Sequence, residues 1–392
     1  MKHSRLHDHH LKLGAVLGEA GGWEMPVHYG DPVAEHTAVR QGVGIADLSH
    51  RGRIRITGED RVKWLQSVIS NDILPLAAGQ GLYSSFLTHK GKMLSYFRVY
   101  ALPESLMLED VGEIGETTFQ ALRKFLLYGT KAKMENCAET WGLLLVSGPK
   151  AAELIKAAFG ADISSLSPLA FLTQKLPLTP TLSPTGGRGE GEGEGGQQAL
   201  LIWTEETGET DIEIMLPADG LVTAWEQLWS AGEPMGLKPF GTEAREALRL
   251  EAGLPRAGAD LTDEIVPPEA NLEGKAFSLS KGCYPGQEVV ARMDTYGSLR
   301  RRLVGLILRD PVLPPKGAKL FSGDREVGWV SSAAHSPSLG CSIALGFPLR
   351  DFTAPGTALT VEIDGRRYDA TVRPLPFYTQ HPAASQNKTI KP

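Results

Sequence analysis

A short pattern, in which a strand, a glycine and a helix follow one another, occurs twice in the N-terminal half of the chain. Gly58 follows a segment of alternating charged and apolar residues at 53–57, and Gly148 follows an apolar run at 143–146. Apolar residues with helical spacing begin after each glycine. This weak internal repeat indicates two related α+β halves rather than one continuous parallel sheet.

Further patterns extend this outline toward the C-terminus. Residues 200–203 and 211–216 are typical of strands, and Thr242 can cap a helix. Over residues 303–373, short strands alternate with Pro, Gly and Asp, which is typical of a small antiparallel β-barrel. A chain of 392 residues is too long for a single core. We therefore expect an α+β fold of two or three domains that ends in this barrel.

The segment 176–198 interrupts these patterns. Its prolines are followed by a run of glycine and glutamate, which buries too little apolar area to offset the entropy of ordering. Residues 191–196 formally match G-x-G-x-x-G, but no strand precedes them and no helix follows, and Glu192 and Glu194 would repel a pyrophosphate. We expect a disordered insert within a domain and no dinucleotide site.

Charge and composition narrow the classes of partner. A net charge of -6 does not favour a general polyanion binder, so stable binding of duplex nucleic acid is not expected. The 3 cysteines are far apart and form no C-x-x-C pair, which argues against a zinc knuckle and a disulfide framework. The first residues lack the apolar core of a signal peptide, and no apolar run reaches the length of a membrane span. We expect a cytoplasmic protein without a membrane partner.

Four histidines, His3, His7, His9 and His10, lie at the start of the chain. They suggest a metal site, but so polar a terminus is more often frayed and solvated. We therefore expect residues 1–20 to be flexible and no metal to be bound.

One octapeptide carries the strongest chemical signal in the chain. Its residues are Lys281, Gly282, Cys283, Tyr284, Pro285, Gly286, Gln287 and Glu288. The two glycines imply a tight turn that presents Cys283, and Lys281 would lower the pKa of the thiol and make it a better nucleophile or soft-metal ligand. Gln287 and Glu288 would fix the turn through hydrogen bonds. An unreactive, buried turn cysteine is an equally open interpretation.

The octapeptide resembles the K-G-C-Y-x-G-Q-E signature of YgfZ-type proteins, a branch of the glycine cleavage T-protein superfamily. The segment 247–255 resembles the R-L-E-A-G segment of the whole superfamily, and further matches lie at 35–40, 44–50 and 70–72. The resemblance covers roughly residues 20–375. It implies three domains arranged as a ring, two α+β domains followed by the β-barrel, with tetrahydrofolate near the central hole.

The patterns and the resemblance together predict domain boundaries. We expect a flexible N-terminus at 1–20, a first α+β domain at 21–145 whose parts interleave with the second, a second α+β domain at 146–298 that contains the insert 176–198, a C-terminal barrel at 299–376, and a tail at 377–392.

The resemblance also implies a folate site. Residues 207–214 resemble T-G-E-D-G-x-E-I, whose last glutamate holds the pterin in the transferases, and this position is Glu213 here. A carboxylate can accept a bidentate pair from the pterin edge; otherwise Glu213 is a solvent-facing strand residue. Glu206 stands where the transferases have a tyrosine. Arg249 either helps to hold the ligand or forms an ion pair on its helix. The other folate contacts that we assign are Glu209, Asn71 and Tyr284.

One position separates the branches of the superfamily. The aminomethyltransferases carry a pair of aspartates after a glycine turn, and one of them is essential for amine release onto folate. Ser95 and Tyr96 occupy these positions here. A serine hydroxyl does not ionise at neutral pH, so it cannot act as an anionic base or stabilise a cationic iminium. The usual aminomethyl transfer is therefore not expected.

Three functional hypotheses follow. The first is a tetrahydrofolate-binding accessory protein that supports iron–sulfur cluster assembly or repair, and so tRNA-modifying enzymes, with Cys283 as the functional thiol. A lone cysteine cannot hold a cluster, so assembly or client proteins would supply further ligands. The alternatives are a folate-dependent one-carbon (aminomethyl or methyl) transferase and a plain folate-binding module with a structural thiol. The run Arg300, Arg301 and Arg302 is either a contact for a polyglutamate tail or an RNA phosphate, or a solvated strand end.

Overall fold

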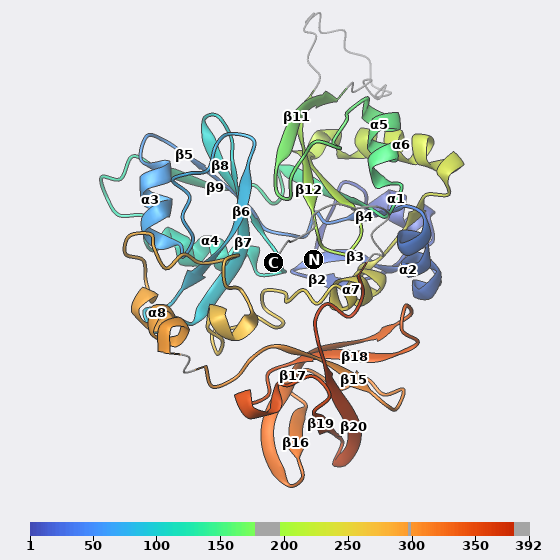
Figure 1. The fold of residues 1–392 in the computed structure, drawn as a ribbon. Helices are drawn as coiled ribbons and strands as arrows, with labels where there is room; N and C mark the ends of the chain where they lie inside the picture. Colours follow the sequence, from blue (N-terminus) through green and yellow to red (C-terminus); the bar gives the residue numbers. More distant parts are fainter. Residues whose placement is uncertain (177–196, 297–298, 380–392) are drawn as a thin grey trace, which may run out of the picture.

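The computed structural model describes residues 1–176, 197–296 and 299–379. Three units meet at a common centre: two α+β units side by side and a β-barrel below them (Figure 1). The predicted fold class, two α+β domains followed by a closed antiparallel barrel in a ring, is confirmed. The insert and its formal G-x-G-x-x-G match lie largely outside the described residues.

The first α+β unit is built on a five-stranded sheet of antiparallel neighbours. In spatial order its strands are β6 (Gly81–Leu87), β7 (Met93–Ala101), β8 (Ser105–Asp110), β5 (Arg53–Thr57) and β9 (Lys133–Asn136). Helices α3 (Arg61–Val68) and α4 (Gly115–Arg123) contribute Trp64, Leu65 and Leu122 to its core. Burial of these apolar side chains gives the unit its own hydrophobic core.

The second unit contains a six-stranded sheet. Its strands are, in spatial order, β11 (Phe171–Leu176), β12 (Gln197–Thr204), β13 (Asp211–Pro217), β10 (Trp141–Ser147), β4 (Gly44–Asp47) and β14 (Lys238–Pro239). Its helices are α2 (Pro32–Gln41), α5 (Ala151–Phe159), α6 (Leu221–Gly232) and α7 (Thr242–Glu251). Because β4 precedes the first sheet in sequence and pairs with β10 of the second, the chain crosses between the units at residues 48–52. This crossover brings Arg51 to the centre.

The first twenty residues, expected to be a flexible terminus, form regular elements that pack on the second unit. They form β1 (Lys2–His3), α1 (His7–Lys12) and β2 (Val16–Ala20), and both strands pair with β3 (Trp23–His28). Leu6 is fully buried in the core of the second unit. The buried His10 pairs through Nε2 with Asp47 Oδ2 at 3.1 Å. One buried apolar side chain and one buried hydrogen bond thus dock an otherwise polar segment.

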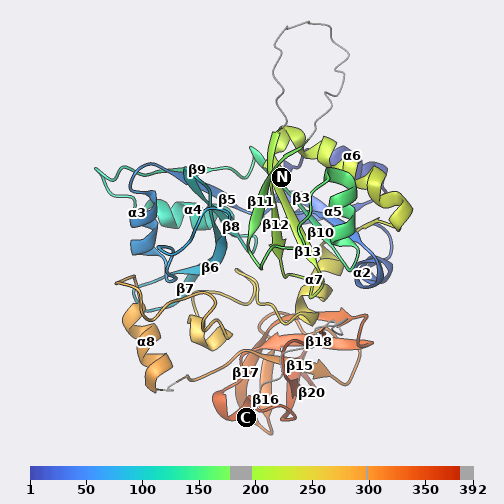
Figure 2. The same cartoon turned by 45° about the horizontal axis from the view of Figure 1, so that its top comes forward.

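The barrel is a closed sheet of six strands. Around it lie β15 (Val304–Leu308), β18 (Cys341–Gly346), β17 (Arg325–Ser336), β16 (Lys319–Ser322), β19 (Ala358–Ile363) and β20 (Arg366–Arg373). Leu306, Leu320 and Val361 are buried in its core. The segment that leads to the barrel includes α8 (Gln287–Tyr296), at the edge of the first unit (Figure 2). Short 3-10 helices lie at Ala218–Gly220, Glu233–Met235, Pro267–Ala270 and Arg350–Phe352.

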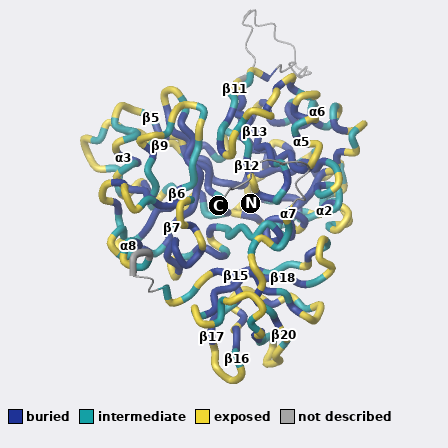
Figure 3. The backbone as a smooth tube through the Cα atoms, viewed as in Figure 1, coloured by how far each residue is buried: buried dark blue, intermediate teal, exposed yellow. Residues whose placement is uncertain are grey.

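Buried backbone is concentrated in the sheets and continues into the centre where the units meet (Figure 3). The centre of the ring is therefore the first place to search for a site.

Within residues 1–176, 197–296 and 299–379, no helix has the length and apolarity needed to cross a bilayer.

Candidate functional site

A hollow lies at the centre of the ring. The first unit contributes Tyr83, Tyr96 and Arg98, α7 contributes Arg245 and Arg249, and the segment after α7 contributes Leu254. The rings of Tyr83 and Tyr96 are stacked, with centroids 5.3 Å apart. The hollow therefore combines aromatic and charged walls.

Positive charge dominates these walls. The cationic lining residues are Arg51, Arg98, Arg245, Arg249, Arg256 and Lys275, whereas the acidic ones are Glu206 and Glu246. Burial, followed by repulsion from Arg51, lowers the pKa of Arg245 to about 10. The Nη1 atom of Arg245 is buried and has no hydrogen-bond partner within the described chain. Such a surplus of cations with an unsatisfied donor fits an anionic or hydrogen-bond-accepting ligand.

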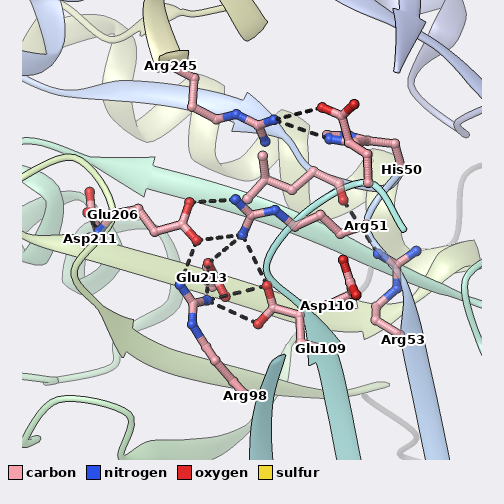
Figure 4. Close-up of polar contacts among 12 residues, drawn as sticks. His50, Arg51, Arg53, Arg98, Glu109, Asp110, Glu206, Asp211, Glu213 and Arg245 are labelled. Atoms are coloured by element: carbon pink, nitrogen blue, oxygen red, sulfur yellow. Dashed lines mark hydrogen bonds and ion pairs between the residues drawn. The ribbon is translucent and has the colours of Figure 1, made fainter. Parts of the chain in front are cut away.

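Two guanidiniums and three carboxylates form a buried cluster beside the hollow (Figure 4). Glu206 Oε1 accepts hydrogen bonds from Arg51 Nη1 at 2.6 Å and Arg98 Nη2 at 2.5 Å, and its Oε2 accepts one from Arg51 Nη2 at 2.6 Å. Burial raises the pKa of Glu206, but Arg51 and Arg98 outweigh it and hold that pKa well below its usual range. The carboxylates of Glu109, Glu206 and Glu213 converge, and the two guanidiniums are shared among the three of them.

Glu213 lies within this cluster and does not line the hollow. Its side chain is fully buried, and its Oε1 accepts from Arg98 Nη1 at 2.7 Å. Its Oε2 has no hydrogen-bond partner among the described residues. Burial, reinforced by Glu109 and Glu206 against the attraction of Arg98, raises the pKa of Glu213 well above its usual value. The solvent-facing alternative for Glu213 is wrong, because β13 is central in its sheet and covered on both faces.

The ion-pair interpretation of Arg249 is confirmed, whereas its contact with a ligand stays a prediction. It lines the hollow, and it forms ion pairs with Glu246 and, through Nη1, with Asp260 Oδ2 at 2.7 Å. Burial lowers the pKa of Arg249, but Glu246 and Asp260 outweigh this and raise it. The paired side chain is therefore held in place at the wall.

The other predicted folate contacts lie outside the lining of the hollow. Asn71 Nδ2 donates to the carbonyls of Tyr83 at 2.7 Å and Lys275 at 3.0 Å, so it positions two lining residues from behind. Glu209 pairs with Arg40 at 3.0 Å. The Tyr284 hydroxyl donates to the carbonyl of Ser278 at 3.2 Å.

Ser95 and Tyr96 point in different directions, as neighbours on a strand do. Tyr96 lines the hollow. Ser95 is buried, and its Oγ lies 2.7 Å from Oγ1 of Thr118 on α4. Neither position supplies a carboxylate to the hollow.

The octapeptide forms a loop whose lysine is a structural tie. Lys281 Nζ donates to three carbonyls near the end of α3, those of Gln66 at 2.6 Å, Ile69 at 2.6 Å and Asn71 at 2.9 Å. Burial lowers the pKa of Lys281 to about 8. Cys283 itself is exposed, so the buried-cysteine interpretation is wrong.

The structure requires glycine at one of the two glycine positions of the loop. Gly282 is exposed, and a Cβ there would meet no atom within 4 Å. Gly286 has a φ of +80°, and a Cβ there would lie 2.5 Å from the carbonyl oxygen of Thr88. The loop can therefore pack directly on the turn between β6 and β7. Gln287 Nε2 donates to the carbonyl of Lys281 at 3.1 Å, as expected, whereas Glu288 forms an exposed ion pair with Arg292.

Sequence reasoning missed the arginines of the centre, above all Arg51, Arg98 and Arg245. Arg98 offers a usable signal, because it interrupts the apolar strand β7. A charged residue within a buried strand requires a partner and so marks a candidate site. Arg51 lies in a short polar crossover and carries no such signal.

Comparison with known proteins extends over nearly the whole chain. The model of the GCVT N-terminal domain matches residues 6–176 and 192–279, and that of the glycine cleavage T-protein C-terminal barrel domain matches residues 301–379. An aminomethyltransferase of Symbiobacterium thermophilum is 34% identical over 387 residues, which cover 96% of this chain and 97% of the relative. That of Bacillus subtilis is 30% identical over 378 residues, with 96% and 99% covered.

A solved structure has the same architecture. The crystal structure of glycine cleavage system aminomethyltransferase T from Bartonella henselae superposes with a TM-score of 0.84 at 26% identity. The match covers 97% of this chain and 98% of that one.

Proposed function

The chain belongs to the glycine cleavage T-protein family, and on that premise we propose that it binds tetrahydrofolate in the central hollow and acts in folate-dependent one-carbon transfer. Aminomethyltransferases of this family use tetrahydrofolate as substrate and cofactor. The observation that carries the proposal is the hollow itself, where a carboxylate, a stacked tyrosine pair and a surplus of cations meet. The predicted superfamily is confirmed, whereas membership of the YgfZ branch stays a prediction.

The lining suits the parts of a reduced folate. A pterin is flat and presents N–H groups along one edge, and its extension ends in carboxylates. The tyrosine pair offers an aromatic wall, and Arg249, Arg256 and Lys275 offer charge to the carboxylates. A carboxylate has about four acceptor sites. Three sites of Glu206 are taken by guanidinium hydrogen bonds, so one remains for the ligand.

Glu206 and Glu213 are rival partners for the pterin edge. Glu213 occupies the position that the resemblance assigns, but its carboxyl is fully buried and its pKa is raised. Glu206 lines the hollow and is held ionised. We therefore assign the pterin contact to Glu206 in this geometry, with Glu213 behind it.

Calorimetric titration with tetrahydrofolate tests this assignment through two isosteric variants, Glu206→Gln and Glu213→Gln. We expect Glu206→Gln to weaken binding at least about tenfold, because a hydrogen bond to a charged group contributes about 1.5–3 kcal/mol. Glu226→Gln, at an exposed site on α6, is the control and should bind as wild type does. If Glu213→Gln loses more affinity for tetrahydrofolate than Glu206→Gln does, the pterin contact belongs to Glu213. If folded wild type does not bind tetrahydrofolate, the proposal of a folate site is wrong.

The names of the relatives favour one-carbon transfer over the accessory role that we first expected. The acids that line the described hollow are Glu206 and Glu246, and no carboxylate stands at positions 95 and 96. Both acids are paired with guanidiniums, Glu206 with Arg51 and Arg98 and Glu246 with Arg249. Burial raises the pKa of Glu246, but Arg249 outweighs this and lowers it to about 2, so neither acid is poised for proton transfer. Single-turnover assays with tetrahydrofolate and an aminomethyl donor test the proposal directly, and folded wild type that binds folate but shows no transfer would contradict it.

The accessory role in iron–sulfur cluster maintenance is a second candidate, because Cys283 is exposed on a firmly tied loop. It predicts that Cys283→Ser impairs an iron–sulfur client enzyme in cells, whereas Cys341→Ser, in the barrel, does not. Both variants should keep wild-type folate affinity. Transfer activity together with an unaffected client enzyme would exclude the accessory role.

A further inference from the structure

Outside the hollow, three side chains converge on the N-terminal sheet: His3 in β1, His7 at the start of α1 and Glu24 in β3. We propose that they form a site for a divalent transition-metal ion such as Zn²⁺. The proposal is independent of the folate site, because none of the three residues lines the hollow. It also revises the expectation from sequence that these histidines bind no metal.

The backbone brings the three groups together before any ligand binds. β1 runs parallel to β3 in a register that places His3 opposite Glu24. Between the histidines, Leu6 is fully buried in the core of the second unit and fixes the turn into α1. His7 is the first residue of α1, so the helix start returns the chain to the same carboxylate. A preorganised site of this kind costs little ordering entropy when an ion binds.

The distances suit an ion with short bonds to nitrogen and oxygen. Glu24 Oε2 lies 2.8 Å from His7 Nε2 and 3.3 Å from His3 Nε2. Ligands bound at about 2.0–2.2 Å in a tetrahedron around Zn²⁺ lie about 3.3–3.6 Å from one another, so Glu24 and His7 must separate slightly when an ion enters. The imidazole rings are stacked at 4.1 Å with an angle of 3°, so they must tilt toward each other to direct both lone pairs at one point. The side chain of His3 is 53% exposed and is free to make this movement.

His7 Nε2 donates to Glu24 Oε2 at 2.8 Å, so an incoming ion displaces the proton between these two atoms. The ring proton then lies on Nδ1, which faces Asp8 Oδ1 at 3.6 Å. This tautomer, with the Nε2 lone pair on the ion, is common around metal-bound histidines. The group offers three protein ligands, two nitrogens and one oxygen, at a partly exposed position. Water can therefore complete a four-coordinate site.

The test is calorimetric titration of Zn²⁺ into the full chain, produced without a polyhistidine tag and first treated with a chelator. Co²⁺ absorption spectra report the ligands independently. We expect one high-affinity ion per chain in wild type, at least tenfold weaker binding in His7→Ala and Glu24→Gln, and weaker binding in Asp8→Asn. His9→Ala is the matched control, because His9 lies in the same helix and pairs with a different glutamate, Glu226, at 3.3 Å. Its affinity should be unchanged.

Circular dichroism confirms that each variant is folded, and His3→Ala provides a second variant at an exposed position should His7→Ala fail to fold. Equal binding by wild type and the His3→Ala/His7→Ala double variant would overturn the proposal. So would a loss in His9→Ala as large as that in His7→Ala. In either case the three side chains are a hydrogen-bonded surface cluster and nothing more.

Discussion

Two buried glutamates, Glu251 and Glu213, differ in how fully their carboxylates are satisfied. Glu251 accepts hydrogen bonds from His36 Nε2 at 2.9 Å, Arg40 Nη2 at 2.6 Å and Ser336 Oγ at 2.5 Å. Burial alone would raise its pKa, but His36, Ser336 and Arg40 lower the pKa of Glu251 to about 2. At Glu213, two guanidiniums are shared among three carboxylates, and the pKa is raised.

The difference distinguishes a glutamate that stabilises the fold from one that lies at the candidate site. The partners of Glu251 come from α2 and from the barrel, while Glu251 itself ends α7, so this carboxylate joins the second unit to the barrel. Glu213 has a less complete set of hydrogen-bond partners than Glu251, and it lies behind the wall of the hollow. A saturated buried charge fixes the architecture, whereas an unsaturated one leaves charge and hydrogen bonds available for a ligand.

The largest expected effect is that of Glu251→Gln. The amide cannot balance Arg40 and directs an N–H group at donors, so the variant should lose about 3–5 kcal/mol of unfolding free energy, as removal of one partner from a buried pair does. Urea denaturation measures the loss. Glu226→Gln, in an exposed pair, should change stability by less than about 1 kcal/mol. If the two variants are equally stable, the saturated cluster is not what holds the barrel.

A smaller loss is expected from Ser95→Asp, which places a carboxylate where the transferases have one. Ser95 is buried against Thr118, whose Oγ1 also bonds Asp110 Oδ2 at 2.9 Å. Burial raises the pKa of Asp110 to about 6, so a second carboxylate there is unfavourable. We expect a loss of about 2–3 kcal/mol at pH 8, and less at pH 5, where protonation relieves the repulsion.

Ser95→Ala is the control and should cost about 1 kcal/mol at either pH, since it removes a hydrogen bond without adding charge. Because position 95 does not line the hollow, Ser95→Asp should not raise transfer activity. A gain in single-turnover rate would show that the side chain reaches the hollow after all.

Local patterns predicted the elements well because the signals are local. The helix expected after Gly148 is α5, and the strand expected at 53–57 is β5. The N-terminus was mispredicted because its docking depends on Leu6 and His10 meeting partners far along the chain. Polarity in a short segment says nothing of such contacts.

The site was harder to predict for the same reason. Motif resemblance identified Glu213 and Arg249, but the hollow depends on which side chains meet across the ring. Arg51 and Glu206, 155 positions apart, are joined by two hydrogen bonds of 2.6 Å. No spacing rule connects them. Burial decides that Glu206, and not Glu213, is the carboxylate at the wall.

The smallest expected effect is the pH dependence of stability that the titration of Glu213 causes. Its pKa is raised in the folded state, so folding takes up a proton between the ordinary glutamate pKa of about 4.3 and the raised pKa. The contribution of this group to stability is complete below that window and falls as pH rises through it, by at most about 1.4 kcal/mol per pH unit. Glu213→Gln removes the titration, so the unfolding free energy of wild type relative to the variant should fall as pH rises from about 5.5 to about 6.5. Urea denaturation across this range measures the difference.

Glu251→Gln is the control: its lost group titrates near pH 2 when folded, so this variant should show no such trend between pH 5.5 and pH 6.5. A constant difference between wild type and Glu213→Gln would mean that Glu213 is ionised like Glu251, and that the cluster is balanced by charge rather than by a buried proton.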